Sequence, residues 1–281
     1  MPDLNVDTIE NCIKNLKLSK SAEVDNIVAE HIVYCFPSIA INLKLLFNIM
    51  IRHCYVPDAF GLGILIPIVK DKSGDQGSLD NYRPITLSSV ISKLFEMVLL
   101  ELFSNFMETD QLQFGFKKKS SFSNALFVVR QLFNYYNERR SNIYIASLDA
   151  SKAFERVNHF TLFSILLKKG FPVYLVDLIS NRYLKLSVTV RWNGFNSDFL
   201  RIHNGVRQGG VLSPTLFNLY VDCIIKTLSN DGSGCHYMNS YVGCIMYADD
   251  LRLISASISN LQCMLNLCGS EGNKLGINFN F

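Results

Sequence analysis

Two adjacent carboxylates, Asp249 and Asp250, lie between two apolar runs, residues 242–246 and 251–254. Because aspartate is unfavourable inside a strand and favourable in a turn, the pattern predicts a β-hairpin that carries both acids at its tip. Two carboxylates held this close together can bind a divalent cation. A solvated turn is the alternative, so the choice depends on the rest of the chain.

A third carboxylate, Asp149, ends a short apolar segment, residues 142–149, that is expected to form a strand. A charge at the end of a buried strand is costly unless it is paired or bound to a cation, which makes Asp149 a candidate site residue. Capping of a helix that is expected to start around residues 151–157 is the alternative. Asp149 and Asp249 are 100 residues apart. They can therefore share a metal only if the fold places two strand ends side by side.

A loop with three glycines covers residues 204–212 and leads into Ser213 and Pro214. Glycine lets the backbone approach a ligand closely, and Ser as N-cap followed by Pro predicts the start of a helix. Within the loop, Gln208 has an amide that can hold a nucleotide or read a base edge. Glycine-rich turns before helices are common, so the loop alone does not define a site.

The net charge of +3, from 27 basic and 24 acidic side chains, is small, so any basic surface for nucleic acid must be local. Residues 113–141 provide a candidate, with six basic side chains against the single acid Glu138. Phe114 and Phe116 lie beside the lysines, and aromatic and basic side chains together suit a phosphate backbone with stackable bases. A solvated loop is the alternative for the lysine run 117–119.

Length and composition set the broad class. A chain of 281 residues with 49% hydrophobic side chains is enough for two packed units. The longest apolar stretches fall far short of the roughly 20 residues of a membrane span, so we expect a soluble protein with no membrane contact. The N-terminus lacks a basic region followed by an apolar one, so we expect an intracellular protein that is not secreted. Eight cysteines without a C-x-x-C pair predict reduced thiols rather than a disulfide framework or a zinc site.

Apolar spacing predicts helices within residues 1–60, from 88 towards 107, over 123–137 and over 175–183. The apolar face expected for the helix over 123–137 contains Leu126, Val129, Leu132 and Phe133. Residues 62–69 and 82–85 are expected to form a hairpin or a strand-loop-strand unit. A second hairpin is expected over residues 186–201, around Asn193 and Gly194.

Five motifs occur in order along the chain. They are NYRPITL at 81–87, QFGF at 113–116 with two serines at 120–121, SLDASKAFERVN at 147–158, GVRQGGVLSPTLFNLY at 205–220 and YADD at 247–250. Together they make the chain resemble the reverse transcriptases of non-long-terminal-repeat, LINE-type retrotransposons, from about residue 62 onwards.

The resemblance implies an α+β, right-hand polymerase fold in which an antiparallel palm sheet packs on helices. The expected parts are a helical lead-in over residues 1–60, fingers over 61–141 and a palm over 142–281. Because the chain stops at Phe281 within an expected strand, the resemblance implies an incomplete palm and an absent thumb.

The resemblance also implies an RNA-directed DNA polymerase, which adds dNTPs to the 3′-hydroxyl of a DNA primer on an RNA template. Two Mg²⁺ ions, with Mn²⁺ as a possible substitute, suit a cluster of hard oxygen ligands. The implied metal ligands are Asp149, Asp249 and the backbone carbonyl of Ala150. Asp250 completes the implied catalytic acids.

Further roles follow from the resemblance position by position. Phe154 matches a steric gate under the sugar of the incoming nucleotide, with core packing as the alternative. Gln208, Lys70 and Arg83 match positions that bind the nucleotide, although the two basic residues could instead be surface charges. The positions that match a segment along the template are Gln113, Phe114, Gly115, Phe116, Lys117, Lys118 and Ser121.

Departures from the family pattern support an alternative function. Glu155 stands where the family usually has a second Asp, and Arg252 interrupts the apolar residues that usually follow the Asp pair. An Arg in a palm strand needs water or a partner. The alternative is an inactive retrotransposon-derived fragment that at most binds nucleic acid. A viral RNA-directed RNA polymerase shares the acidic palm, but Phe154 and the loop resemble DNA-synthesising enzymes. A retroelement enzyme is expected in the nucleus or the cytoplasm.

Overall fold

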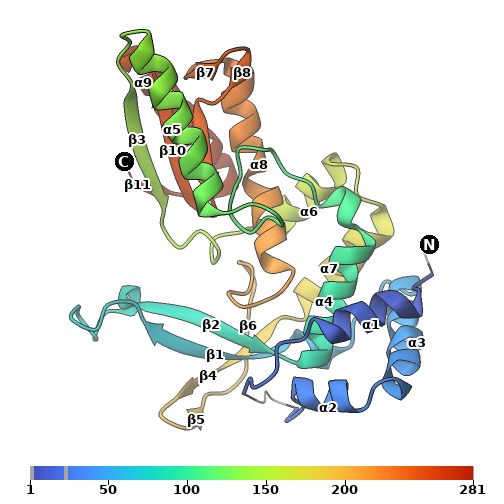
Figure 1. Ribbon diagram of the computed structural model, residues 1–281. Helices are drawn as coiled ribbons and strands as arrows, with labels where there is room; N and C mark the ends of the chain where they lie inside the picture. The colour runs from blue at the N-terminus through green and yellow to red at the C-terminus, as the bar shows by residue number, and fades with distance from the viewer. Residues whose placement is uncertain (1–2, 22–24, 281) are drawn as a thin grey trace. The chain divides into compact units, whose positions relative to one another are not determined.

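The computed structural model describes residues 3–21 and 25–280, which form two compact units (Figure 1). Unit 1 contains the described residues of Met1–Phe106 together with Phe163–Ser213. Unit 2 contains Met107–Leu162 together with the described residues of Pro214–Phe281. Each unit is therefore built from two separate stretches of the chain. The division into lead-in, fingers and palm follows from the resemblance and stays a prediction.

Unit 1 begins with three helices, α1 (Val6–Lys14), α2 (Ala29–Tyr34) and α3 (Ser38–Arg52). The side chain of Asn5 accepts from the N–H of Asp7 and so caps the start of α1, whose Ile9 and Ile13 are buried. In α3 the buried residues include Leu43, Phe47 and Met50, which recur at helical spacing. The helices expected within the first 60 residues are confirmed.

The sheet of unit 1 is built on β1 (Leu62–Val69) and β2 (Tyr82–Ser88), which form the expected antiparallel hairpin. β1 also pairs in parallel with β4 (Ser187–Trp192). Asn193 and Gly194 have φ angles of 48° and 84°, and they turn β4 into β5 (Phe195–Asn196). These angles suit the tight turn that Asn-Gly favours, so the second hairpin is also confirmed. β6 (Leu200–Arg201) pairs with β4 as well.

Two longer helices complete unit 1. α4 (Val90–Leu102) begins where the Ser89 side chain accepts from the N–H of Ser92, and it buries an almost continuous apolar surface. α7 (Val173–Leu184) follows Pro172 and confirms the helix expected there. Short 3₁₀ turns η1 (Asp58–Gly61), η2 (Leu79–Asn81) and η3 (Ser104–Phe106) connect the elements. The chain passes from unit 2 to unit 1 within α6 (His159–Lys168).

Unit 2 contains an antiparallel sheet with the strand order β11-β3-β10-β9. Its strands are β3 (Tyr144–Ala150), β9 (Cys244–Tyr247), β10 (Asp250–Ser255) and β11 (Phe279–Asn280). Figure 1 shows α5 (Phe122–Glu138) crossing in front of β3 and β10. Ala125 and Leu132 of α5 share a core cluster with Ile245 and Ile254 of the sheet. Alternation along β10 therefore places Arg252 and Asp250 on the same face as Ile254.

Two further helices lie largely in unit 2. α8 (Ser213–Asp231) starts at the expected Ser-Pro pair, and its Phe217, Val221, Ile224 and Leu228 are buried. α9 (Ile258–Leu275) packs against β10 and β3 and ends at Gly276, whose φ is +69°. A small hairpin joins β7 (His236–Tyr237) to β8 (Ser240–Tyr241). Within the two described ranges, each helix is too short or too polar to span a membrane.

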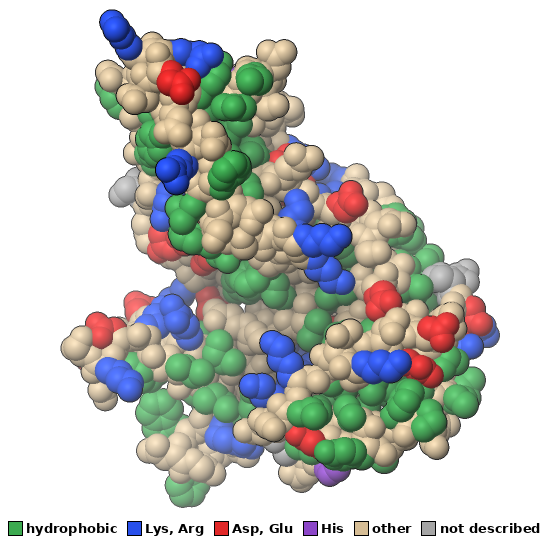
Figure 2. Space-filling model, in the orientation of Figure 1, with side chains coloured by type: hydrophobic (Ala, Val, Ile, Leu, Met, Phe, Trp, Pro, Cys, Tyr) green, Lys and Arg blue, Asp and Glu red, His purple; other side chains and the backbone are tan. Residues whose placement is uncertain are grey.

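The apolar face expected for α5 is partly wrong. Leu126 and Phe133 are 52% and 41% exposed, whereas Ala125 and Leu132 are buried. The helix is turned so that the smaller Ala125, rather than Leu126, meets the sheet. Figure 2 shows hydrophobic side chains beside Lys and Arg side chains over this part of unit 2. The spacing identified a helix, but the contact with the sheet decided which face is buried.

The helix expected to start around residues 151–157 begins later, at His159, because residues 151–156 form turns. Lys152 has a φ of +52°, which an α-helix does not allow. The Ser151 N–H donates to the Asn278 carbonyl at 3.1 Å, and the Ser151 hydroxyl contacts the Asn280 side chain at 3.1 Å. The segment after Asp149 is therefore tied to the end of β11 instead of starting a helix.

Candidate active site

The hairpin between β9 and β10 carries the two adjacent acids, as expected. Tyr247 pairs with Asp250, so the connection consists of Ala248 and Asp249 alone. Ala248 has a φ of +58°, a left-handed conformation that is unfavourable for a residue with a Cβ. Asp249 is half-buried at the tip and Asp250 is exposed as the first residue of β10. A strained turn of this kind needs support from its surroundings.

Gln113 supplies this support. Its amide oxygen accepts from the N–H groups of Ala248 and Gly115 at 3.1 and 2.9 Å, and its amide nitrogen donates to the Ala248 carbonyl at 3.2 Å. Gly115 lies so close that a Cβ there would be 2.2 Å from the Ala248 nitrogen. The Phe114 N–H donates to the Met246 carbonyl at 2.8 Å. The segment therefore holds the turn that carries Asp249.

Asp149 lies beside this turn. β3 pairs with β10 so that Leu148 is opposite Leu251. Asp149 is the next residue of β3 and Asp250 the preceding residue of β10, so the two acids extend this antiparallel pairing at its end. Asp149 is opposite Asn280 of β11. The fold thus brings two strand ends together, as sharing of a metal between Asp149 and Asp249 requires.

The acids form a region of concentrated negative charge. Burial raises the pKa of the Asp249 carboxyl, and the charges of Asp250, Asp149 and Glu155 raise it further, against a backbone hydrogen bond that lowers it. Arg252 lies on the same strand, and its guanidinium is 3.9 Å from the Asp250 carboxylate. The partner that an Arg in this strand requires is therefore Asp250.

The donor set suits a hard divalent cation. Carboxylate oxygens are the ligands that Mg²⁺ prefers, and a cation would offset the repulsion that raises the pKa of Asp249. In the part of the chain that the structure describes, no three Asp, Glu, His or Cys side chains are already arranged around a common metal position. The carboxylates fit a metal by chemistry and by their place at adjoining strand ends.

Phe154 is packed among aromatic rings in unit 2. It stacks on Phe217 with ring centres 4.5 Å apart and meets Phe116 edge to face at 5.8 Å. Phe154 is half-buried, so part of the ring remains accessible. Phe154 lies five residues after Asp149 in the sequence, within the turns that follow β3.

The residues that match nucleotide-binding positions in unit 1 gather along β2. Arg83 lies on β2 opposite Ile68 of β1. Lys70 follows Ile68 by two residues and so lies on the same face of the hairpin as Ile68 and Arg83. The Lys70 ammonium donates to the Asp80 carbonyl at 2.9 Å. The Gln208 carbonyl accepts from the N–H of Thr86 on β2 at 2.7 Å. The backbone of the β1–β2 hairpin therefore connects to the Gln208 loop at Thr86, three residues after Arg83.

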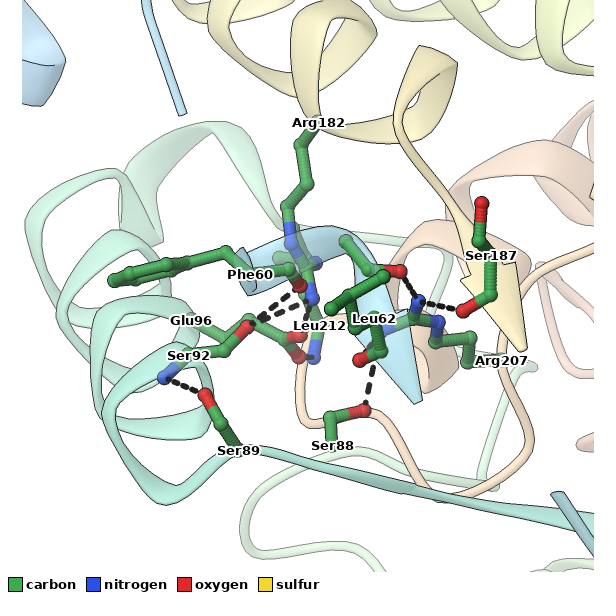
Figure 3. A network of polar contacts seen from close by, with 11 residues as sticks. Phe60, Leu62, Ser88, Ser89, Ser92, Glu96, Arg182, Ser187, Arg207 and Leu212 are labelled. Carbon is green, nitrogen blue, oxygen red and sulfur yellow. Dashed lines mark hydrogen bonds and ion pairs between the residues drawn. The ribbon is translucent and has the colours of Figure 1, made fainter. Parts of the chain in front are cut away.

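Buried charges hold the loop that carries Gln208 (Figure 3). Arg207 donates to the carbonyls of Gly61, Leu62 and Ser187, and Glu96 accepts from the N–H of Leu212 at 2.6 Å. The sequence reasoning did not single out Glu96 or its partner Arg182. A single acid inside the apolar run 94–100 was the signal that could have identified Glu96.

The segment that matches the template region is divided between buried and exposed residues. Gln113 is 1% exposed, and Phe114 packs against the core cluster of unit 2. The Lys117 ammonium donates to the carbonyls of Thr109 and Asp110. Ser121 caps α5. The exposed members of the set are Phe116, Lys118 and Ser121.

Comparison with known proteins agrees with the family that the motifs indicate. Residues 69–281 match the family described as reverse transcriptase (RNA-dependent DNA polymerase). Because this match covers more than half of the chain, the chain belongs to the reverse transcriptase family. Members of this family generally use divalent metal ions.

The relatives are proteins of non-long-terminal-repeat retrotransposons. A Pol polyprotein from a type-2 retrotransposable element of Drosophila melanogaster is 29% identical over 186 residues, covering 66% of this chain and 18% of the relative. A Pol polyprotein from a type-1 element of Nasonia vitripennis is 27% identical over 232 residues, covering 80% and 22%. A probable RNA-directed DNA polymerase from transposon BS of Drosophila melanogaster is 26% identical over 264 residues, covering 90% and 28%. The chain thus spans 18–28% of the length of these relatives.

Proposed function

We propose that this chain contributes the polymerase centre of an RNA-directed DNA polymerase, which extends a DNA primer with dNTPs on an RNA template. The observation that carries the proposal is the pairing of β3 with β10 at Leu148 and Leu251, the neighbours of Asp149 and Asp250, next to the turn that holds Asp249. Family membership supplies the reaction class. In this proposal the chain provides fingers over residues 61–141 and a palm over 142–281, and it works in the nucleus or the cytoplasm.

The carboxylates Asp149 and Asp249, with the carbonyl of Ala150, would hold two Mg²⁺ ions, for which Mn²⁺ can substitute. When bound, the ions activate the primer 3′-hydroxyl and neutralise charge on the leaving phosphate. Asp250 adds to the negative field that attracts the cations, and Gln113 keeps the turn in place. The raised pKa of Asp249 supports this role, because a carboxylate in repulsive surroundings gains from a bound cation.

The remaining residues bind and orient the substrates. Lys70 and Arg83 bind the triphosphate, because an ammonium point charge and a planar guanidinium both pair well with phosphate oxygens. Gln208 contacts the incoming nucleotide, and Phe154 lies against its sugar and rejects a 2′-hydroxyl. Support for the gate is the aromatic stack on Phe217, which fixes the ring of Phe154.

Template contact in this proposal falls on the exposed Phe116 and Lys118 of the matching segment. Phe116 and Lys118 offer a ring for stacking and a charge for phosphate. Gln113, Gly115 and Ser121 act indirectly by shaping the segment and starting α5. Phe114 and Lys117 belong to this supporting group, through the core cluster and through backbone carbonyls.

Primer extension on a primed RNA template with Mg²⁺ tests the proposal. We expect incorporation of dNTPs by the wild-type chain and its loss in Asp149→Ala. A matched control is Asp198→Ala, which changes an exposed carboxylate in the β5–β6 connection. Absence of incorporation, or incorporation that Asp149→Ala leaves intact, would overturn the proposal.

A second candidate is an inactive fragment that binds nucleic acid. The observation that favours it is the ion pair between Arg252 and Asp250, which places a positive charge at the proposed metal site. In that case the wild-type chain and Asp149→Ala bind a primer-template equally, and neither incorporates nucleotides. Fluorescence anisotropy with a labelled primer-template, run beside primer extension, separates the two candidates.

A further inference from the structure

Buried charged side chains fix the Gln208 loop at both of its ends (Figure 3). On the N-terminal side, Arg207 is 5% exposed and its guanidinium donates to the Leu62 carbonyl and the Ser88 hydroxyl, each at 3.3 Å. On the C-terminal side, the Leu212 N–H donates to the Glu96 carboxylate at 2.6 Å. Gln208 lies between these two anchors.

The second anchor depends on a buried ion pair. Glu96 of α4 is 1% exposed, and one of its oxygens accepts from Arg182 of α7, which is 4% exposed. The other oxygen accepts from Leu212. Arg182 also donates to the Ser92 hydroxyl at 3.3 Å. The pair therefore joins two helices to the backbone of the loop.

The loop has little freedom between its anchors. Gly209 has a φ of +105°, and a Cβ at this position would lie 2.6 Å from the Thr86 carbonyl. The Gln208 carbonyl accepts from the N–H of the same Thr86. A shift of Leu212 would therefore be passed to Gln208 through a short, tightly packed segment.

A buried ion pair seldom stabilises a fold more than apolar side chains of the same volume would. It can, however, fix the direction of the groups that it contacts, and an apolar pair cannot accept a hydrogen bond from Leu212. The geometry thus separates two roles for Glu96: neutralising Arg182, and holding one peptide group of the loop.

We propose that Glu96 is a positioning residue for the nucleotide contact of Gln208. Glu96 holds the Leu212 N–H, and Arg182 neutralises the charge of the buried Glu96 carboxylate. Neither residue contacts the substrate. This inference rests on the proposed function, because it assigns the purpose of the anchor to dNTP binding.

Two double variants test the inference. Glu96→Met with Arg182→Met removes both charges together, so that no unpaired charge is left in the core, and it also removes the acceptor for Leu212. Glu96→Gln with Arg182→Met removes the charges but retains an acceptor. Glu101→Gln is the control on the same helix, since Glu101 contacts the thiol of Cys12.

We expect KM for dNTP to rise about tenfold in the first double variant, while kcat changes less than about twofold. The variant that retains the acceptor and Glu101→Gln should stay within about twofold of wild type.

Amide hydrogen exchange provides a readout without catalysis, in which Leu212 loses protection only in the first variant. Equal KM values and equal protection in the two folded double variants would overturn the inference. If the wild-type chain does not incorporate nucleotides, the proposed function fails, and exchange at Leu212 still decides whether Glu96 holds the loop.

Discussion

Arg252 gives the acidic turn a positive neighbour on its own strand. Its guanidinium is 3.9 Å from the Asp250 carboxylate, and the two side chains are 43% and 53% exposed. An ion pair this exposed contributes about 0–1 kcal/mol to the free energy of unfolding. We expect Arg252→Leu to change stability by less than about 1 kcal/mol in urea unfolding. The same variant should reach half-maximal incorporation at a lower Mg²⁺ concentration, because the guanidinium no longer competes for Asp250.

The control for Arg252 is Arg52→Leu, which removes a similarly exposed pair with Asp3 in unit 1. This variant should leave the Mg²⁺ dependence unchanged. A higher Mg²⁺ requirement in Arg252→Leu would show instead that Arg252 supports the metal site, for example by orienting Asp250.

The buried Tyr183 should make the free energy of unfolding depend on pH in the alkaline range. Burial raises its pKa to about 12 from an ordinary value of 10.0. Between these values the unfolded chain releases the phenolic proton while the folded chain retains it, so the free energy of unfolding falls as pH rises. The loss totals about 3 kcal/mol for a shift of this size. Urea unfolding from pH 9 to 12 should show a shallower decline for Tyr183→Phe, whereas parallel declines would contradict the assignment.

At the scale of residues, the sequence identifies residues with a chemical role better than it identifies the residues that hold them in position. Asp149, Asp249 and Asp250 are recognisable because carboxylates at strand ends are costly without a function. Gln113 matched a template position, yet its amide holds the turn, and this pairing depends on a residue 135 positions away. Glu96 and Arg182 are 86 positions apart, so local spacing could not pair them.

The hairpin of β9 and β10 and the segment through Gly115 act as one structural element. A Cβ at Gly115 would lie 2.2 Å from the Ala248 nitrogen, and backbone atoms cannot move aside as a flexible side chain can. We expect Gly115→Ala to lower the free energy of unfolding by about 1–3 kcal/mol, as overpacking does, and to reduce incorporation by displacing Asp249. Urea unfolding and primer extension measure both effects.

The matched control for this element is Gly74→Ala. A Cβ at Gly74 would meet side-chain atoms of Asn81 and Asp71 at 3.2 and 3.4 Å, which can move. Stability and incorporation in this variant should stay close to wild type. A Gly115→Ala protein as stable and active as the control would show that the approach to Ala248 is not needed.

Elements with strong local signals were predictable. Asn193 and Gly194 favour one turn geometry, so the hairpin from β4 to β5 follows from two residues. Contacts with other elements decided the rest. The buried face of α5 depends on the sheet that it meets, and residues 151–156 form turns because Ser151 bonds to the end of β11.

At the scale of the molecule, each unit joins two stretches of chain that the sequence does not visibly connect. The parallel pairing of β1 with β4 joins residues about 125 positions apart, such as Leu62 and Ser187. Alternation within a strand shows which side chains share a face, but it does not identify the neighbouring strand. The motifs indicated the family, and the family implied that the two strand ends with Asp149 and Asp250 adjoin.

Binding of metal at these strand ends should stabilise unit 2 as a whole, because a ligand that binds only the folded state raises the free energy of unfolding. The gain is about 2.7 kcal/mol when the free ion is at 100 times its dissociation constant. We expect MgCl₂ to raise Tm of the wild-type chain above its value in NaCl of the same ionic strength, and EDTA to reverse the rise. Asp149→Asn combined with Asp249→Asn should abolish the difference between the salts, because the remaining Asp250 cannot hold the ion alone. An equal rise in this double variant would place the bound ion at other carboxylates and remove the metal site from the junction of β3 and β10.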